Sequence, residues 1–378
     1  MNLQEYGFFD YAAPGNGGME LFQLDDYRLL LDEMAAAGMN SLGLGVKWQT
    51  TGYRSRLPFL DQLGGCPNID SDNELMRRVI AEARQRGIKT WLLAAVNCYD
   101  AKKFGSTPHA VSDSESGIKL PIRVGFYDSD LPEMVERIPL IFEELVELFQ
   151  GIDGLVVELE NTDMEMPHRI PLYNKWAEKN GRLPFDKLGH PLRGKIFDVP
   201  DWRDYTTMSK VNILKRVEAA ARGKGFRGAF ATVCEVGRMR SYAISQVINL
   251  HEFHQQLPDW LMVTYQFEKW HHRHAIMDFC INDPKQESGR VLYLARGVMT
   301  WGKWPLPMAL EQGWELDVED IRNYQPTSVW WFGCGSLNDG SVVSLSKLRE
   351  LGYRDGLETR RALLKKAASL RGEGICIV

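Results

Sequence analysis

Short apolar runs recur along this chain, and they constrain its fold more than any other feature of the sequence. Each run has the length of a single strand. The eight runs are GFFDY (7–11), NSLGLGVKW (40–48), IKTWLLAAVN (88–97), GLVVELE (154–160), RGAFATVCE (227–235), WLMVTY (260–265), RVLYLARG (290–297) and TSVWWFG (327–333). Near-continuous apolar runs of this kind are typical of the buried strands of a parallel sheet.

Amphipathic stretches lie between these runs. The clearest are DDYRLLLDEMAAAG (25–38) and NELMRRVIAEARQRG (73–87), in which apolar residues recur at helical spacing. Both end in a glycine, Gly38 and Gly87, where a helix C-cap is expected. The repeating unit is therefore helix, glycine and buried strand, which predicts parallel strands joined by helical crossovers.

Polar or aromatic residues follow nearly every predicted strand. They are Asp10, Trp48, Asn97, Glu160, Glu235, Tyr265, Arg296 and Trp331. A (β/α)8 barrel builds its active site at this end of all its strands, whereas an open doubly wound sheet, the alternative, concentrates its site at one switch point. We therefore predict an α/β fold, a (β/α)8 TIM barrel formed by residues 1–378 as a single domain. No GxGxxG or GxxxxGK[ST] motif follows a strand, so a phosphate-cradling nucleotide site is not expected.

Two long loop inserts interrupt the pattern, residues 98–130 after the third strand and residues 161–203 after the fourth. The second insert contains MPHRIPLYNKW and GRLPFDKLGHPLRG, which are rich in proline, glycine and aromatic residues. Because both inserts follow strand C-termini, we expect them to lie over the mouth of the barrel and to shape a substrate cleft.

Composition excludes several classes of partner. The formal net charge of −5 and the isoelectric point near 6.0 give no electrostatic reason to expect nucleic acid or an anionic membrane surface. No apolar run is long enough to span a bilayer, and the N-terminal residues do not resemble a signal peptide, so a cytoplasmic protein is expected. The six cysteines are scattered without a CxxC pair, which favours reduced thiols over a zinc ribbon or a disulfide framework.

Two glutamates in the fourth run are the strongest candidates for chemistry. The period of two in a strand puts Val156, Glu158 and Glu160 on one face of GLVVELE and three apolar residues on the other. The apolar face suits packing against helices, so both glutamates should point into the barrel. Two carboxylates whose backbones are roughly 6.6 Å apart repel each other, and this raises the pKa of one of them and favours a proton donor.

Glu160 lies nearer the mouth and is the expected acid, with Glu158 orienting it. The alternative is a buried ion pair between one of these glutamates and an inward Arg or Lys. A second carboxylate could come from Glu235, at the end of the fifth strand, or from Glu268, beyond the sixth. Carboxyl groups about 5 to 5.5 Å apart would indicate retaining glycoside hydrolysis, and about 6.5 to 9.5 Å inverting hydrolysis. The alternative for Glu235 is an ion pair with a nearby arginine.

Tryptophans and polar side chains near the strand ends fit a carbohydrate cleft, because sugars present apolar faces and many hydroxyl groups. The tryptophans are Trp48, Trp301, Trp304, Trp330 and Trp331. Neighbours on a strand face opposite ways, so one of the last two should be core, and we expect Trp331 to point inward. After the second strand, Arg54 offers a positively charged hook for the substrate or belongs to a solvated loop. The histidines of EKWHHRH (268–274) lack the spacing of a zinc site, so no metal is expected.

The segment IDGLVVELE resembles the D-x-x-D-x-D-x-E signature of the family 18 chitinases, with Asp153 first and Glu160 at the acid. Val156 and Glu158 replace the two later aspartates of the signature. MVTYQFEKW (262–270) is similar to the family's sixth-strand M-x-Y-D, and SVWWFG to its eighth-strand tryptophan segment. The resemblance implies a barrel glycosidase in which the acid glutamate protonates the leaving group and Tyr265 supports the site.

The sequence thus predicts a glycoside hydrolase that cleaves a small saccharide or glycoside by carboxylate acid/base catalysis and needs no organic cofactor. Glu160 is the expected acid/base and Glu235 the nucleophile or base, with support from Glu158, Tyr265 and Glu268. The expected substrate-binding residues are Asp10, Trp48, Arg54, Asn97, Asn161, Arg296, Trp301 and Trp331. Two alternatives are a metal-assisted sugar isomerase, epimerase or lyase, and a non-catalytic carbohydrate-binding barrel. Sugar identity, stereochemical outcome and oligomeric state stay open.

Overall fold

The computed structural model describes most of the regular elements of the chain. It covers residues 2–10, 23–46, 53–59, 73–95, 98–100, 124–126, 132–159, 169–188, 200–236, 250–266, 291–295, 314–324, 326, 328–332, 356–370 and 376–377.

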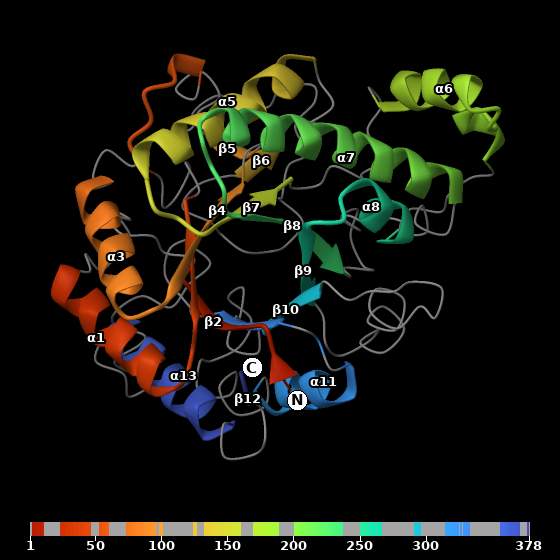
Figure 1. The fold of residues 1–378 in the computed structure, drawn as a ribbon. Coiled ribbons are helices and arrows are strands. Elements are labelled where there is room, and N and C mark those ends of the chain that lie inside the picture. The colour runs from red at the N-terminus through yellow and green to blue at the C-terminus, as the bar shows by residue number, and fades with distance from the viewer. Residues whose placement is uncertain are drawn as a thin grey trace.

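Eight parallel strands form the centre of the molecule (Figure 1). They are β2 (Glu5–Asp10), β3 (Ser41–Gly45), β4 (Lys89–Ala95), β7 (Gly154–Glu158), β8 (Ala229–Val236), β9 (Trp260–Gln266), β10 (Val291–Ala295) and β11 (Ser328–Phe332). They close into a barrel in the order β10-β11-β2-β3-β4-β7-β8-β9. Each predicted apolar run overlaps one of these strands, so the (β/α)8 barrel is confirmed and the open sheet is excluded.

Helices surround the barrel. They are α1 (Leu24–Ala36), α3 (Asn73–Gln85), α5 (Pro132–Leu148), α6 (Arg169–Lys179), α7 (Pro200–Gly223), α8 (Leu250–Gln256), α11 (Trp314–Tyr324) and α13 (Gly356–Ser369), with the 3-10 helix η2 (Phe185–Lys187). Gly38 and Gly87 follow α1 and α3 with φ values of 73° and 69°, a conformation that favours glycine, so both predicted helix ends are confirmed. None of the described helices is long and apolar enough to cross a membrane.

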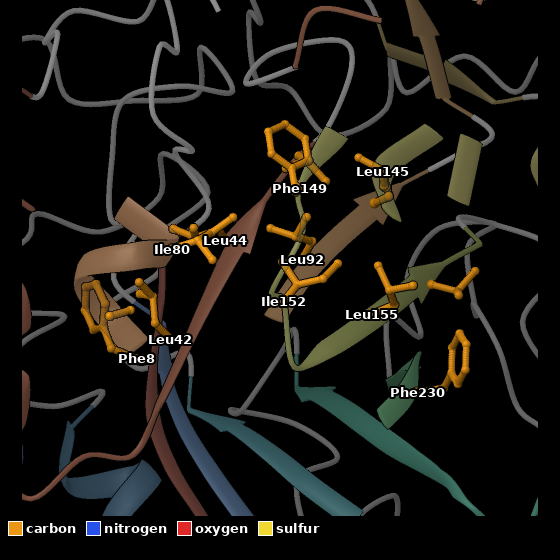
Figure 2. Close-up of a cluster of buried hydrophobic side chains, with 14 of the residues drawn as sticks. Phe8, Leu42, Leu44, Ile80, Leu92, Leu145, Phe149, Ile152, Leu155 and Phe230 are labelled. Carbon is orange, nitrogen blue, oxygen red and sulfur yellow. The ribbon is translucent and has the colours of Figure 1, made fainter. Parts of the chain in front are cut away.

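The larger apolar core fills the space between strands and helices. Figure 2 shows part of it, where Leu42, Leu92 and Leu155 project from three strands toward Ile80 of α3 and Leu145 of α5. All of these side chains are buried. Strand residues in this core point outward toward the helices, so the residues that alternate with them face the barrel interior.

A second buried cluster fills the barrel itself. Its members are Phe9, Trp91, Leu93, Val156, Ala231, Val233, Leu261, Val263, Leu292 and Trp330. Three large rings dominate it: Trp330 stacks on Phe9 at a centroid distance of 6.3 Å and meets Trp91 edge-on at 5.5 Å. The interior on the side of β2, β4 and β11 is therefore a packed aromatic core and not a channel.

Inward glycines make room for these rings. A Cβ atom at Gly154 would lie 2.0 Å from Cε3 of Trp91, and one at Gly43 would lie 2.4 Å from Cδ2 of Phe9. Register explains the first contact, because Trp91 on β4 pairs with Gly154 on β7. A large side chain on one strand thus occupies the volume that its neighbour leaves empty.

Polar groups gather at the N-terminal end of the barrel. The carboxylate of Glu5 on β2 accepts hydrogen bonds from Ser41 Oγ on β3 and from Lys89 Nζ on β4, the latter at 2.8 Å. Burial raises the pKa of Glu5 above its ordinary value of 4.5, although the hydrogen bond and the charge of Lys89 oppose this. These hydrogen bonds give the Glu5 carboxylate a structural role.

The structure also contains elements that the sequence patterns did not predict. β1 (Asn2–Leu3) pairs in parallel with β12 (Cys376–Ile377), and β5 (Cys98–Asp100) pairs antiparallel with β6 (Val124–Phe126). The second pair lies within the insert 98–130. These strands are too short to show a period of apolar residues.

The described part of the insert 161–203 forms a small aromatic cluster of its own. Tyr173 and Ala177 of α6 pack with Trp202 and Tyr205 near the start of α7. In Figure 1 α6 lies at the edge of the molecule beside one end of α7. The expectation that both inserts cover the barrel mouth concerns mainly residues 101–123, 160–168 and 189–199, which lie outside the described residues.

Candidate active site at the strand C-termini

Strand β7 presents its residues as the sequence predicts. Val156 belongs to the interior cluster, whereas Leu155, Val157 and Leu159 belong to the core between strands and helices. Glu158, two residues after Val156, therefore shares the interior face, and it is only 2% exposed. A buried carboxyl group thus lies where β7 ends, at the end of the barrel where such folds carry their active sites.

Strands β8 and β9 bring two further predicted residues together. In the β8–β9 register, Glu235 pairs with Tyr265, and Val233 pairs with Val263. The β7–β8 register ends with Val157 opposite Thr232, so the next position along β7 is Glu158. Three of the proposed catalytic positions, 158, 235 and 265, consequently lie on consecutive strands at one end of the barrel. This proximity comes from topology, because 107 positions separate the first from the last in the chain.

The other predicted residues divide into two groups. Asp10 is the last residue of β2 and pairs with Leu44, so its backbone lies at the expected strand end. The residues that lie outside the described part of the chain are Glu160, Glu268, Trp48, Asn97, Asn161, Arg296 and Trp301. Their roles stay predictions.

Trp331 does not point into the barrel, and this expectation was wrong. Its ring stacks on Trp314 of α11 at a centroid distance of 4.1 Å, and its Nε1 donates to Tyr6 Oη at 3.2 Å. Trp330 takes the interior position instead, within the aromatic core. The prediction that one tryptophan points inward and the other outward was correct, but the two were exchanged. The sequence does not distinguish them, because this strand is apolar on both faces and either ring can be buried on either side.

Arg54 belongs to a segment that is anchored on the outer helices. Its backbone N–H donates to the side chain of Asn73 at the start of α3, at 2.9 Å. The adjacent Tyr53 is buried in the core between strands and helices, and its hydroxyl donates to Glu144 of α5 at 3.0 Å. These contacts fix the backbone of the segment, and the role of the Arg54 side chain as a substrate hook stays a prediction.

Helix α7 contributes buried polar residues that sequence reasoning missed. Thr207 and Lys210 are 0% and 2% exposed, although they occupy the helix stripe that continues as Leu214, Val217 and Ala221. Lys210 Nζ donates to the carbonyl oxygen of Val233 on β8 at 2.6 Å. The signal was present in the sequence, because a lysine and a threonine replace apolar residues at positions of the buried stripe.

Comparison with known proteins adds information about the fold. No protein-family model and no curated protein matches the sequence. Among solved structures, the catalytic domain of β-amylase from Paenibacillus polymyxa matches with a TM-score of 0.53 at 10% identity, over 93% of this chain and 98% of that one. β-Galactosidase from the psychrophilic Marinomonas ef1 has the same TM-score and identity, over 98% of this chain and 60% of that one.

The glycoside hydrolase domain of PgaB (BpsB) from Bordetella bronchiseptica matches with a TM-score of 0.50 at 14% identity, over 87% of this chain and 93% of that one. The neighbours of this chain in structure are TIM-barrel glycoside hydrolases. The likeness is one of fold. It does not confirm the resemblance to family 18 in particular, and at these identities it does not transfer residue roles.

The described strand ends carry residue types that can take part in proton transfer. Within the described ranges, no three His, Cys, Asp or Glu side chains are grouped as metal ligands. The histidines of segment 268–274 lie outside those ranges. What the strand ends do bring together is a buried glutamate, a second glutamate position and a tyrosine position, which are residue types suited to proton transfer.

Proposed function

We propose that this protein is a glycoside hydrolase that cleaves an O-glycosyl bond of a small saccharide or glycoside by carboxylate acid/base catalysis. The observation that carries the proposal is the interior placement of Glu158 at the C-terminal end of β7. The sequence pattern predicts that Glu160, two residues later, shares this side. The barrel likeness to several glycoside hydrolases supports the proposal at the level of fold.

Glu160 serves in this proposal as the general acid/base, and Glu235 serves as the nucleophile or base. The register that pairs Glu235 with Tyr265 supports a shared site, because both positions lie near the C-terminal ends of β8 and β9, the two strands that follow β7 in the barrel. Glu158 and Tyr265 position the reacting groups, and Glu268 is the alternative partner. The remaining substrate-binding candidates are Asp10, Trp48, Arg54, Asn97, Asn161, Arg296 and Trp301. No organic cofactor is required for this chemistry.

The test is hydrolysis of a broad panel of aryl glycosides by the wild type and by Glu160→Gln, which keeps the shape of the side chain but cannot donate a proton. Loss of general acid catalysis should lower kcat/KM by about 10²-fold or more. Glu147→Gln is the matched control, because Glu147 lies on α5 and pairs with Lys224 and Arg56, away from the strand ends.

Wild-type turnover by Glu160→Gln on the best substrate would refute the assignment of the acid. For an active enzyme, the anomer formed first, followed by NMR, distinguishes retention from inversion. Retention would support Glu235 as a nucleophile, and inversion would support it as a base.

A further inference from the structure

The residues of α7 that pack on the barrel are polar near the start of the helix and apolar farther along it. From Leu214 onward its buried residues are apolar, as expected for a helix covering a parallel sheet. Nearer the start of the helix the same stripe continues as Lys210 and Thr207, and both are buried. A lysine that is 2% exposed is costly unless its ammonium group finds hydrogen bonds and opposite charge.

The contact of Lys210 lies where two strands stop pairing. The last recorded β7–β8 pair is Val157 and Thr232, and Thr232 Oγ1 donates to the Val157 carbonyl oxygen at 2.9 Å. Lys210 Nζ donates to the carbonyl of the next β8 residue, Val233, at 2.6 Å. The ammonium group is thereby held at the level of Glu158 on β7 and two residues before Glu235 on β8.

We propose that Lys210 is a positioning residue of the carboxylate site, whose ammonium group fixes the end of β8 and supplies the positive charge beside the carboxyl-bearing ends of β7 and β8. This inference rests on the proposed function for its catalytic consequence. A buried positive charge stabilises the ionised form of a nearby carboxyl group, because little water screens the interaction. Lys210 thus keeps the nucleophile or base ionised at pH values at which a crowded pair of carboxyl groups would retain a proton.

Several charged groups on elements that pack against α7 form ion pairs away from Lys210. On α5, Glu136 pairs with Arg216 of α7, and Glu143 and Glu147 pair with Lys224, directly after the helix.

Beside α6, Arg182 pairs with Asp201 and Asp204 at the start of α7. On the α8 side, Glu252 accepts a hydrogen bond from Gln256. Arg203 of α7 and His254 of α8 are further titratable groups on these two helices. Lys210, by contrast, donates directly to the backbone of β8.

The experiment compares Lys210→Met and Lys210→Arg with the wild type. Lys215→Met is the matched control, because Lys215 lies on the same helix but is exposed and donates to Gln256. The pH profile of kcat/KM is measured on the best aryl glycoside. Removing the charge should move the acidic limb of the profile to higher pH by about one unit, whereas Lys210→Arg and Lys215→Met should keep the wild-type limb.

A second measurement does not depend on activity. Glutamate labelled with ¹³C at the carboxyl carbon allows the Glu158 and Glu235 signals to be assigned by their loss in Glu158→Gln and Glu235→Gln, and to be titrated by NMR. Lys210→Met should move the Glu235 titration to higher pH. Lys210→Gln provides a smaller neutral variant should the methionine variant not fold.

The outcomes separate the two proposals. A titration shift in a protein without glycosidase activity would support the charge role and refute the proposed function. Unchanged titrations in a folded neutral variant would overturn the inference, even if its activity or thermal stability fell, because a merely structural lysine would produce such a fall without moving a carboxyl pKa.

Discussion

The two ends of the barrel both carry a buried glutamate, and they use it differently. At the N-terminal end, Glu5 accepts hydrogen bonds from Ser41 and Lys89, so the carboxylate is part of a closed polar cluster. At the C-terminal end, Glu158 lies beside the strands that carry Glu235 and Tyr265, and the buried Lys210 reaches the same level from α7. An inward glutamate is therefore not a sign of chemistry by itself. Its place along the strand decides between stability and function.

The aromatic core between the two ends should dominate stability. Trp330→Ala removes the ring that contacts both Phe9 and Trp91, and rings this deeply buried cost about 3–5 kcal/mol when truncated. Urea unfolding at one pH measures the change. Leu183→Ala, at a side chain that is 55% exposed, is the control and should change stability by less than about 0.5 kcal/mol. A Trp330→Ala protein as stable as the wild type would show that the aromatic core does not dominate stability.

The next largest effect should be a loss of catalytic activity on substitution of the glutamate at the C-terminal end of the barrel, and not of the one at the N-terminal end. Glu158→Gln should lower kcat/KM on the best substrate by about 10²-fold, or about 2.7 kcal/mol, because the amide cannot hold the charge that orients the acid. Glu5→Gln should keep wild-type turnover. If the two variants lost equal activity, or if Glu5→Gln were the weaker enzyme, the functional distinction between the two ends would fail.

The smallest effect should be a change in the pH dependence of stability at the other end. The folded-state pKa of Glu5 is raised above 4.5, so the folded protein holds this proton at pH values at which the unfolded chain has lost it. Stability contributed by the protonated group is full below about pH 4.5 and falls as pH rises through the folded pKa, with a slope of at most about 1.4 kcal/mol per pH unit. Glu5→Gln should remove this slope. Urea midpoints of both proteins across this pH range measure it, and parallel curves would contradict the assignment.

The sequence was sufficient to predict the barrel strands because each is a near-continuous apolar run, and to predict the inward face of β7 because its outer face is wholly apolar. It was not sufficient to orient β11, where Trp330 and Trp331 are both large and apolar and only the neighbouring strands and α11 decide which ring goes inside. Lys210 was missed for a related reason. A lone lysine in a helix is normally solvated, so the position of Lys210 on the apolar stripe of α7 was a weak signal until the packing of α7 on β8 showed that it is buried.

The exchange of volume between Trp91 and Gly154 has a consequence for how this protein can evolve. Any side chain at 154 collides with the indole ring, and any smaller residue at 91 leaves a void that the glycine cannot fill. Neither residue can therefore be substituted without a change at the other position. In related sequences the two positions should vary together, with a small residue at 91 accompanied by a larger one at 154. The combined side-chain volume of the two positions should then be preserved, although neither residue is.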